Sequence, residues 1–424
     1  MLNDDQKNCL EKIKQWWASP ELYFIIEGKA GTGKTYLTLQ LIKELVYCKP
    51  LITATTHEAV RQLSLVTGKD HEIKTTYSAL GFGFDSSKKT EELKQLRTPL
   101  ELENYNLLII DEASYIGSAL YEAILKTKMK VLFIGHRNQL PEVVKKISSF
   151  DRYDSIIFKQ NFPIYTLTVP VRNSGRIFEY CNKIEFLIDS NKRIIPKDFD
   201  ISKNDFEERL FIDKENLQKE KTKVICWRHE LVDSINDKVR KFIFGGDSVN
   251  KFLPQDRLIL TSLCFSLGSG LERYSESKIF RSKNSKIQFN NNSTIELIKV
   301  ETVSVLGLEC YKLHSILDNE KVVLYTPVRT EDLEKLYKHY LQKAYGCNSQ
   351  RTKENAFRNL HFLMKLFAQV KHSYCITAYK CQGMTIPRVI VRLDDISRYP
   401  NIYVRFKMLY TSCSRASEEL MVVR

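Results

Sequence analysis

The first part of the chain alternates short apolar runs with amphipathic segments. Four runs are almost continuously apolar, and stretches with the 3.6-residue period of helices separate them; the runs are residues 22–28, 51–56, 107–113 and 131–136. Such runs are typical of parallel strands that are buried on both faces. The pattern therefore predicts a parallel α/β domain over about the first 170 residues.

The alternation is interrupted once within this domain and then starts again. Residues 78–100 bring two aromatic residues on a glycine-containing turn, followed by charged residues, which favours a small insertion. A second alternating block begins near Leu167. In it we expect a helix over 175–187, a strand over 223–228 and a helix over 229–244. The chain thus has two α/β blocks of similar architecture.

A change of composition marks a second insertion. Residues 252–328 read as successive strands with turn signals, and Asn290–Ser293 can make a tight turn between two of them. Residues 331–370 predict two helices with interleaved basic and aromatic residues, after which buried-strand composition returns. The second α/β domain is therefore interrupted and later resumed.

These blocks predict an α/β fold with two parallel-sheet domains, each carrying an insertion. The predicted limits are 1–77 and 101–170 for the first domain, 78–100 for its insertion, 171–245 and 371–424 for the second domain, and 246–370 for a β-barrel plus helical insertion.

Composition adds a class of partner to this picture. The 424 residues carry 65 Lys and Arg against 51 Asp and Glu, a net charge of +14, which favours a polyanion, nucleic acid before an anionic membrane. No apolar run approaches the ~20 residues of a bilayer span, and the first residues lack signal-peptide features, so we expect a cytoplasmic protein. The ten cysteines include no C-x-x-C pair, which favours reduced, buried thiols.

A phosphate-binding motif follows the first strand. Residues 28–35, GKAGTGKT, match G-x-x-x-x-G-K-[ST] between a strand and a helix. In such a loop the backbone N–H groups face phosphate oxygens, the lysine reaches the β and γ phosphates and the final hydroxyl binds Mg²⁺. The predicted ATP-binding residues are Gly28, Ala30, Gly31, Thr32, Gly33, Lys34 and Thr35, with Thr35 also a metal ligand. The alternative is a glycine-rich turn with an exposed lysine.

Two adjacent acids follow the run 107–110. The strand delivers Asp111 to the carboxyl edge of the sheet, where it can bind Mg²⁺, and Glu112 can polarise the attacking water. The alternative is that both acids cap the next helix. Together with the loop, the pair predicts hydrolysis of a nucleoside triphosphate.

Five motifs in order extend this prediction. Residues 27–35, 111–114, 135–141, 378–385 and 409–416 resemble the motifs of superfamily 1B DNA helicases of the RecD/Dda branch. The resemblance implies two RecA-like domains, a pin insertion, an SH3-like barrel, and an ATP- and Mg²⁺-dependent helicase. It also implies 5′-to-3′ movement on single-stranded DNA, unwinding of forked duplex DNA and a phage origin.

The resemblance assigns further nucleotide contacts. Gln6 matches a residue that reads adenine, and Gln139 matches one that senses the γ-phosphate. Arg172 and Arg415 match two arginines that the second domain presents to the transferring phosphoryl group. Gly383 matches a backbone contact near the γ-phosphate. An exposed glutamine, a loop amide and a simple turn are the alternatives for Gln6, Gln139 and Gly383.

It also implies a track for DNA. The matching residues are Thr55, Thr56, His57, Thr75, Thr76, Phe82, Phe84, His229, Thr377 and Lys380. Helix capping is the alternative for the hydroxyls, and core packing is the alternative for the two phenylalanines of the wedge. The chain departs from the family at Thr55, where proline is usual, at His136, where an acid is usual, and at Glu142, in place of a second proline.

The leading hypothesis is a translocase that unwinds DNA, and the alternative is a DNA-dependent ATPase switch without processive unwinding. A P-loop kinase needs neither the second α/β block nor the late arginine, and no long basic amphipathic helix favours a membrane-surface ATPase. The resemblance implies a functional monomer, single-strand-binding or replication proteins as candidate partners, and action in the cytoplasm of a host.

Overall fold

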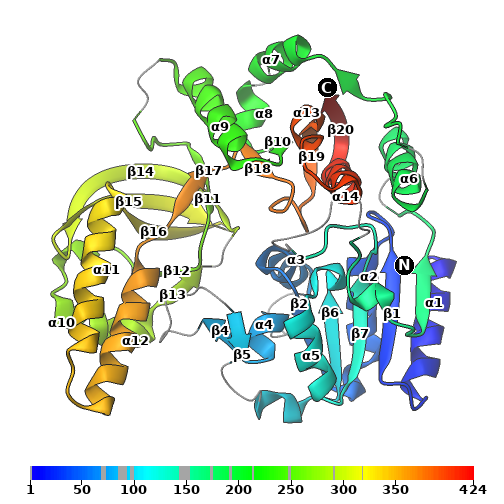
Figure 1. Cartoon of the computed structure of the whole chain (residues 1–424), viewed down its shortest axis with the longest axis horizontal. Coiled ribbons are helices and arrows are strands. Elements are labelled where there is room, and N and C mark those ends of the chain that lie inside the picture. Colours follow the sequence, from blue (N-terminus) through cyan, green and yellow to red (C-terminus); the bar gives the residue numbers. More distant parts are fainter. Residues whose placement is uncertain are drawn as a thin grey trace.

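The computed structural model describes most of the chain and divides it into three bodies (Figure 1). The described residues are 2–67, 73–84, 93–95, 100–142, 153–171, 175–190, 193–212, 214–246, 250–289, 292–317 and 319–424. Two bodies are built on parallel sheets, and the third is built on an antiparallel sheet beside them.

The first body is a six-stranded parallel sheet. Its strands are β1 (Tyr23–Gly28), β2 (Pro50–Ala54), β3 (Ile73–Thr75), β6 (Leu107–Asp111), β7 (Lys130–Gly135) and β8 (Ile164–Leu167), in the order β3-β2-β6-β7-β1-β8. Helices α1 (Asp4–Trp17), α2 (Lys34–Glu44) and α3 (His57–Thr67) cover one face, and α5 (Ser118–Lys126) covers the other.

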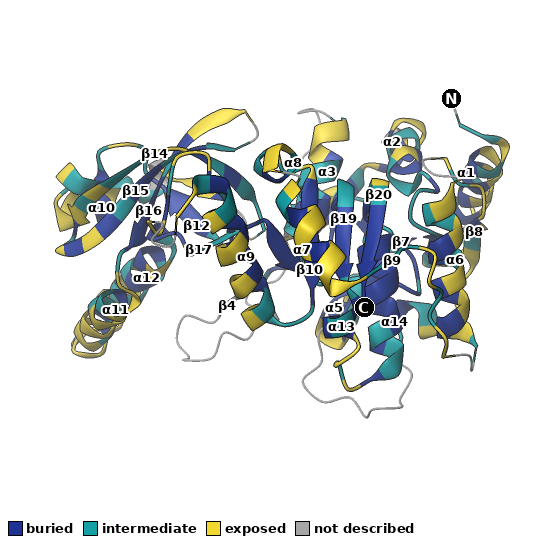
Figure 2. Ribbon diagram, turned by 90° about the horizontal axis from the view of Figure 1, so that it is seen from above, coloured by how far each residue is buried: buried dark blue, intermediate teal, exposed yellow. Residues whose placement is uncertain are grey.

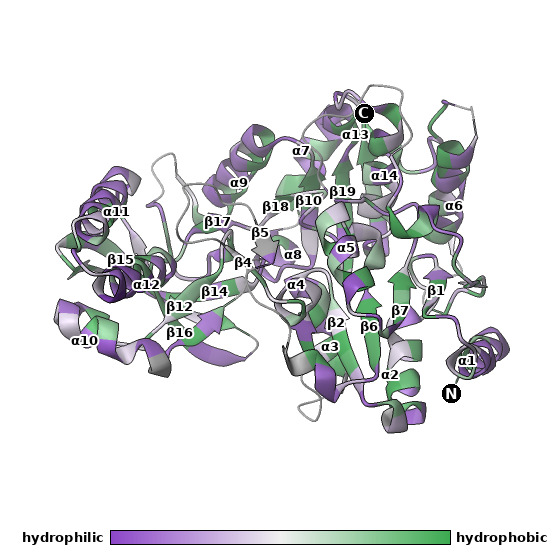
Figure 3. Ribbon diagram, turned by 60° about the horizontal axis from the view of Figure 1, so that its bottom comes forward, coloured by the Kyte–Doolittle hydropathy of each residue, from purple (hydrophilic) through white to green (hydrophobic). Residues whose placement is uncertain are grey.

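Burial on both faces explains the continuous apolar runs. Successive side chains of a strand point to opposite faces, so Ile109 packs with α2 and its neighbour Ile110 packs with α5. All five residues of β6 are buried. The strands predicted from the four runs are confirmed as neighbours in one parallel sheet, and they stand out as apolar in Figure 3.

The second body is a five-stranded parallel sheet. Its strands are β9 (Asp200–Ile201), β10 (Thr222–Cys226), β18 (Cys375–Thr377), β19 (Ile386–Arg392) and β20 (Ala416–Val423), in the order β18-β10-β19-β20-β9. One face packs against α6 (Arg176–Asp189), α13 (Leu393–Ile396) and α14 (Ile402–Cys413), and the other against α7 (Lys203–Ile212), α8 (Lys214–Gln218) and α9 (His229–Phe244). Figure 2 shows buried β19 and β20 behind the largely exposed α7.

The third body is a five-stranded antiparallel sheet with helices. Its strands are β11 (Arg257–Leu260), β14 (Thr294–Val305), β15 (Leu308–Leu317), β16 (Glu320–Pro327) and β17 (Val370–His372), in the order β16-β15-β14-β11-β17. A separate pair, β12 (Cys264–Ser266) and β13 (Ile287–Phe289), and the helices α10 (Glu276–Arg281), α11 (Thr330–Tyr345) and α12 (Gln350–Leu366) complete it.

A short hairpin stands on the first body. It consists of α4 (Thr76–Ala79), β4 (Phe82–Phe84) and β5 (Leu93–Gln95), which lie at the predicted insertion 78–100. The predicted domain limits remain a prediction. The third body takes its last strand, β17, from residues just past 370, and β18 belongs to the second parallel sheet.

The strands on either side of Asn290–Ser293 pair with other strands: β13 pairs with β12, and β14 pairs with β11 and β15. Phe289 of β13 and Ile295 and Leu297 of β14 nevertheless pack in one core cluster. The ten cysteines are free thiols, as expected, and nine of them are buried.

Candidate functional site

The loop between β1 and α2 is shaped by its glycines. Gly31 and Gly33 have φ of 86° and 77°, a left-handed conformation that residues with a Cβ rarely adopt. A Cβ on Gly28 would lie 2.6 Å from Thr32 Oγ1. The Thr32 hydroxyl donates to the Lys29 carbonyl over 2.9 Å and closes the turn. This geometry turns backbone N–H groups inward, as a phosphate-binding loop requires.

Lys34 begins α2 and folds into this loop. Its Nζ donates to the carbonyl oxygens of Gly28 over 2.6 Å and Lys29 over 3.0 Å. Burial lowers the pKa of Lys34, whereas the nearby charges of Glu112 and Asp111 act to raise it. The loop lysine and the acid pair therefore share one site, although Lys34 and Asp111 are 77 residues apart in sequence.

The acid pair ends β6 in a constrained conformation. Burial, reinforced by the charge of Glu112, raises the pKa of Asp111 to about 7. Glu112 has φ 52° and ψ 42°, which is left-handed and uncommon for a residue with a side chain. Its N–H donates to Asp111 Oδ1 over 2.8 Å, and its carbonyl accepts from Thr55 Oγ1 over 2.9 Å. Neither carboxylate caps the short 3₁₀ helix that follows, so the alternative that both acids are helix caps is not supported.

The second body contributes Arg415 to the same site. Arg415 is 7% exposed and donates to Thr411 O over 3.1 Å and Ser414 Oγ over 3.0 Å. Its charge acts to lower the pKa of Lys34, although burial is the larger cause. A guanidinium of one body and the loop lysine of the other are thus close enough to interact. The other predicted arginine, Arg172, lies outside the described residues.

Gln6 packs directly against the loop. Its side chain is 2% exposed, and its Nε2 donates to Thr32 O over 3.3 Å. Its Oε1 accepts from Asn3 N, which forms a capping box at the start of α1. The alternative of an ordinary exposed glutamine is therefore wrong. Gly383 has φ 79°, and a Cβ there would come within 3.6 Å of Ala59 N at the start of α3.

Gln139 is also buried, with 4% of its surface exposed. Its Oε1 accepts from Ser114 Oγ over 3.1 Å, so it connects the third motif to the residues after the acid pair. The next residue, Leu140, connects to the second body: its N–H donates to Thr411 Oγ1 over 3.3 Å and its carbonyl accepts from Gln382 Nε2 over 2.9 Å. The alternative of a solvent-facing loop amide is wrong.

The predicted DNA-binding hydroxyls divide into two groups. Thr56 and Thr75 are helix caps, since their Oγ1 atoms accept from Ala59 N and Ser78 N, each over 3.2 Å. Thr55 and Thr76 are buried, with 5% and 0% exposed, and bond to Glu112 O and Thr53 Oγ1. In this structure each of the four hydroxyls has an internal partner. Their contact with DNA stays a prediction.

The other predicted DNA contacts lie on different elements. His57 begins α3, and burial lowers its pKa. His229 begins α9 and is exposed.

Thr377 ends β18 and is 6% exposed, and Lys380 in the following turn is partly buried. Phe82 lies edge-on to Tyr77, with ring centroids 5.7 Å apart, and packs on the core of the first body. For Phe84 the structure describes only its place at the end of β4.

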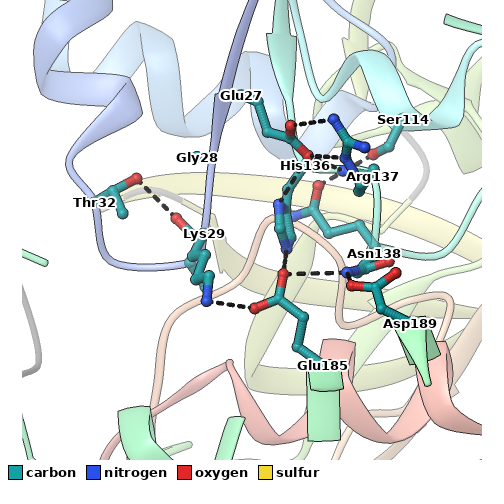
Figure 4. A network of polar contacts seen from close by, with 12 residues as sticks. Glu27, Gly28, Lys29, Thr32, Ser114, His136, Arg137, Asn138, Glu185 and Asp189 are labelled. Atoms are coloured by element: carbon teal, nitrogen blue, oxygen red, sulfur yellow. Dashed lines mark hydrogen bonds and ion pairs between the residues drawn. The ribbon is translucent and has the colours of Figure 1, made fainter. Parts of the chain in front are cut away.

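A network of charged residues that the sequence did not predict connects the two parallel-sheet bodies (Figure 4). Arg137 pairs with Glu27 over 2.6 Å, and His136 lies between Glu27, at 3.6 Å, and Glu185 of α6, at 2.9 Å. Lys29 of the loop pairs with the same Glu185 over 2.6 Å. The departure of His136 from the family pattern was visible in the sequence, but its partner Glu185 was not.

Among the described residues no group of three or more His, Cys, Asp and Glu could hold a metal ion. Within the same part of the chain, no helix is both long and apolar enough to cross a bilayer.

Family models match both ends of the chain. One described as an AAA domain matches residues 13–145, and one described as a UvrD-like helicase C-terminal domain matches residues 372–423. The two matches cover the loop with the acid pair and the segment that carries Arg415.

Similar proteins span almost the whole length. The ATP-dependent DNA helicase Dda of Enterobacteria phage T4 is 23% identical, covering 100% of this chain and 99% of that protein. An uncharacterized protein of Acanthamoeba polyphaga mimivirus is also 23% identical, with 99% of each covered. The ATP-dependent DNA helicase Pif1 of Campylobacter jejuni is 24% identical, covering 89% of this chain and 85% of that protein.

Solved structures show the same fold. Pif1 helicase from Candida albicans matches with a TM-score of 0.54 and 17% identity, covering 100% of this chain and 94% of that one. Bacteroides Pif1 in complex with ADP-AlF3 and single-stranded DNA matches with a TM-score of 0.51 and 17% identity, covering 100% and 92%.

Proposed function

We propose that this chain, which belongs to the superfamily 1B helicases of the Pif1 and Dda type, is an ATP-dependent DNA helicase that moves 5′ to 3′ on single-stranded DNA. One observation carries the proposal: Asp111, Glu112 and Arg415 of the other body all lie near enough to Lys34 for their charges to act on it, and Asp111 and Arg415 are buried. ATP hydrolysis between two bodies can change their separation, and such a change moves a bound strand.

The residues at the loop fit a magnesium nucleotide. Asp111 and Thr35 offer a carboxylate and a hydroxyl, the hard oxygen ligands that Mg²⁺ takes together with phosphate oxygens and water. Burial and the charge of Glu112 raise the pKa of Asp111, and a bound cation would offset both effects. When bound, Mg²⁺ would neutralise charge on the β and γ phosphates.

The protein groups then have distinct roles. Lys34 binds the β and γ phosphates, exchanging its present carbonyl partners for phosphate oxygens. Glu112 orients the attacking water and takes its proton. Arg415 stabilises the charge that develops on the transferring phosphoryl oxygens. Because Arg415 comes from the second body, hydrolysis depends on how the two bodies meet, and Arg172 would act in the same way.

Contacts at the acid pair support coupling to DNA. Thr55 begins the segment after β2 that the resemblance assigns to DNA, and its hydroxyl donates to Glu112 O over 2.9 Å. A shift of this segment on DNA binding would therefore reach the catalytic acid. Gln139, bonded to Ser114, provides a second route from the third motif.

A group of bases on the third body supports a polyanionic partner. The basic cluster (Lys283, Lys286, His361 and Lys365) lies among aromatic rings. Lys286 Nζ and Lys365 Nζ are 4.2 Å and 5.7 Å from the ring centroid of Phe265, and Lys283 Nζ is 5.5 Å from that of Phe280. Burial and the nearby Lys365 and Lys286 charges lower the pKa of His361 to about 4. Bases that repel one another in this way gain most from a phosphate backbone.

The proposal also covers the oligomeric state, the protein partners and the DNA substrate. We expect a monomer to be active, since each group named above comes from one chain, and we expect single-strand-binding or replication proteins as partners in a cytoplasm. Forked duplex DNA is the expected substrate, with the β4–β5 hairpin and Phe82 as the wedge.

Tailed duplexes test this function. With ATP and Mg²⁺, the protein should unwind a duplex with a 5′ tail and leave one with a 3′ tail intact, and single-stranded DNA should raise the rate of ATP hydrolysis. Lys34→Ala should remove both activities while the protein stays folded. DNA-stimulated hydrolysis without strand separation would instead support an ATPase switch, and preference for the 3′ tail would overturn the direction.

A further inference from the structure

The charged network of Figure 4 crosses from one parallel-sheet body to the other. Lys29 and His136 belong to the first body and converge on Glu185, which α6 of the second body presents. Lys29 Nζ lies 2.6 Å from Glu185 Oε2, and His136 Nε2 lies 2.9 Å from Glu185 Oε1. Both oxygens of one carboxylate are thus held by the other body.

This carboxylate is shielded from water. Glu185 is 8% exposed, His136 is 3% exposed and Glu27 behind it is 4% exposed. Charged groups are buried at a high cost unless partners compensate for the lost hydration. The ion pairs of Glu185 with Lys29 and His136 therefore form only when the two bodies meet in this register, and another register would remove these cations from Glu185.

The bridge leads from the loop to the catalytic arginine. Lys29 lies inside the phosphate-binding loop, and α6 packs with α14 in one core cluster of the second body. Arg415 lies just beyond the end of α14. Holding Glu185 to Lys29 and His136 therefore fixes α6, and through α14 it fixes Arg415, relative to the loop.

Histidine suits this position because it faces two carboxylates. His136 Nε2 lies 2.9 Å from Glu185 Oε1 and His136 Nδ1 lies 3.6 Å from Glu27 Oε1, so a positive charge on the ring attracts both carboxylates, although neither ring nitrogen has a partner in hydrogen-bond geometry among the described residues. Burial raises the pKa of each glutamate, but contacts with His136, Arg137 and Lys29 lower it, and the pKa of each is about 2. The charged and titratable groups around His136 are Glu27, Arg137, Lys29, Glu185, Asp189 and Tyr410.

We infer that His136 and Glu185 are positioning residues for ATP hydrolysis: they form a charged bridge that sets the phosphate-binding loop against the second body. This inference rests on the proposed function and adds to it two residues that position the loop relative to Arg415. Where the family carries an acid, this chain places a base that meets an acid of the facing body.

Steady-state ATP hydrolysis at saturating single-stranded DNA tests the bridge. His136→Gln and Glu185→Gln should each lower kcat between about 5- and 100-fold and change KM for ATP less than about threefold, because positioning is lost while the loop itself is intact. The double variant should be no slower than the slower single variant. Glu179→Gln, at an exposed position of the same helix, is the matched control and should keep the kcat of the unmodified protein.

Rescue by a charged side chain separates positioning from a merely structural role. His136→Lys, which keeps a positive charge at this place, should restore much of the kcat that is lost in His136→Gln. A His136→Lys protein as slow as His136→Gln, or variants that match Glu179→Gln, would overturn the inference.

A second readout does not depend on DNA. In a double-variant cycle of thermal unfolding, the effects of His136→Gln and Glu185→Gln should be non-additive, because the two side chains share one contact. If single-stranded DNA did not stimulate the unmodified protein, the proposed function would fail, and the cycle would still decide whether the bridge exists. Additive effects would refute the bridge itself.

Discussion

Thr55→Val tests whether the segment assigned to DNA also supports the catalytic acid. Valine keeps the branched shape of threonine but replaces the hydroxyl that donates to Glu112 O over 2.9 Å. Glu112 stays left-handed with two further bonds, from its own N–H to Asp111 Oδ1 over 2.8 Å and from Tyr115 N to its carbonyl over 3.0 Å. The substitution removes one of these three restraints and leaves the phosphate-binding loop untouched.

The size of the effect follows from the hydrogen bond and the strain. A buried hydrogen bond contributes about 1 kcal/mol, and a left-handed conformation costs a non-glycine residue about 1–3 kcal/mol. We expect Thr55→Val to lower the free energy of unfolding by about 1 kcal/mol. If the same loss weakens the placement of Glu112 in the transition state, kcat falls about fivefold, since about 1.4 kcal/mol corresponds to a factor of ten.

The assay is ATP hydrolysis at saturating ATP and saturating single-stranded DNA, with DNA affinity measured separately. Thr127→Val is the control, because the Thr127 hydroxyl also donates to a backbone carbonyl, that of Ile124 over 2.7 Å, but at the end of α5. It should lose similar stability and keep its kcat. A Thr55→Val protein with normal kcat and weakened DNA binding would refute the reasoning, because it would show that the hydroxyl serves DNA and not Glu112.

Three further predictions follow from the site and its surroundings. Arg415→Ala should lower kcat about 10³-fold and ATP affinity less than tenfold, and equal losses in both would exclude a role in the transition state. Glu27 and Glu185 have pKa values held at about 2 by their hydrogen bonds, against an ordinary value of 4.5, so each contributes stability above about pH 4.5 that is lost as the pH falls toward 2. Between pH 4.5 and pH 2 the free energy of unfolding should therefore fall less in Glu185→Gln than in the unmodified protein, with a difference on the order of 2 kcal/mol over the whole window. Lys286→Glu should weaken DNA binding and reduce its salt dependence by about one charge, without changing hydrolysis in the absence of DNA, whereas an unchanged salt slope would place the basic cluster away from the DNA.

The parallel sheets were predictable because their signal is local. A strand buried on both faces is apolar at nearly every position, as at residues 107–110 of β6, and the short length of such a run favours a strand over a buried helix. The pairing of β13 with β12 was not predictable, because the turn residues near Asn290 say only that the chain reverses. Which strand lies alongside depends on burial of residues far away in sequence.

The phosphate-binding motif could be read from the sequence for a different reason. Phosphate binding needs glycines, a lysine and a hydroxyl at fixed offsets. The loop 28–35 has all of them in one short segment, so the motif can be recognised without the fold. The hydroxyls of Thr55 and Thr76 were harder to interpret, because a hydroxyl serves a phosphate, a cap or a buried carbonyl equally well. Only the fold determines which partner is within reach.

Contacts between the two parallel-sheet bodies could not be predicted from motifs alone, since each needs both partners. On α14, Tyr410 OH accepts from Ala30 N in the loop over 3.4 Å, and Thr411 Oγ1 accepts from Leu140 N over 3.3 Å. Arg415 lies two residues after the end of α14. One helix thus touches the loop and the third motif and carries the arginine of the site.

A sequence signal for this role does exist. Lys407, Thr411 and Arg415 follow one another at four-residue steps, so they share one face of α14 and its continuation, in a segment that is otherwise largely apolar. Lys407 is fully buried, and its Nζ donates to Arg137 O over 2.9 Å and Asp154 Oδ1 over 2.8 Å, both in the first body. A polar stripe on an apolar helix marks a face that meets polar groups of another body. Because a helix moves as a rigid element, a change at the Lys407 end reaches Arg415 directly, so opening of the interface withdraws the arginine from the phosphate site.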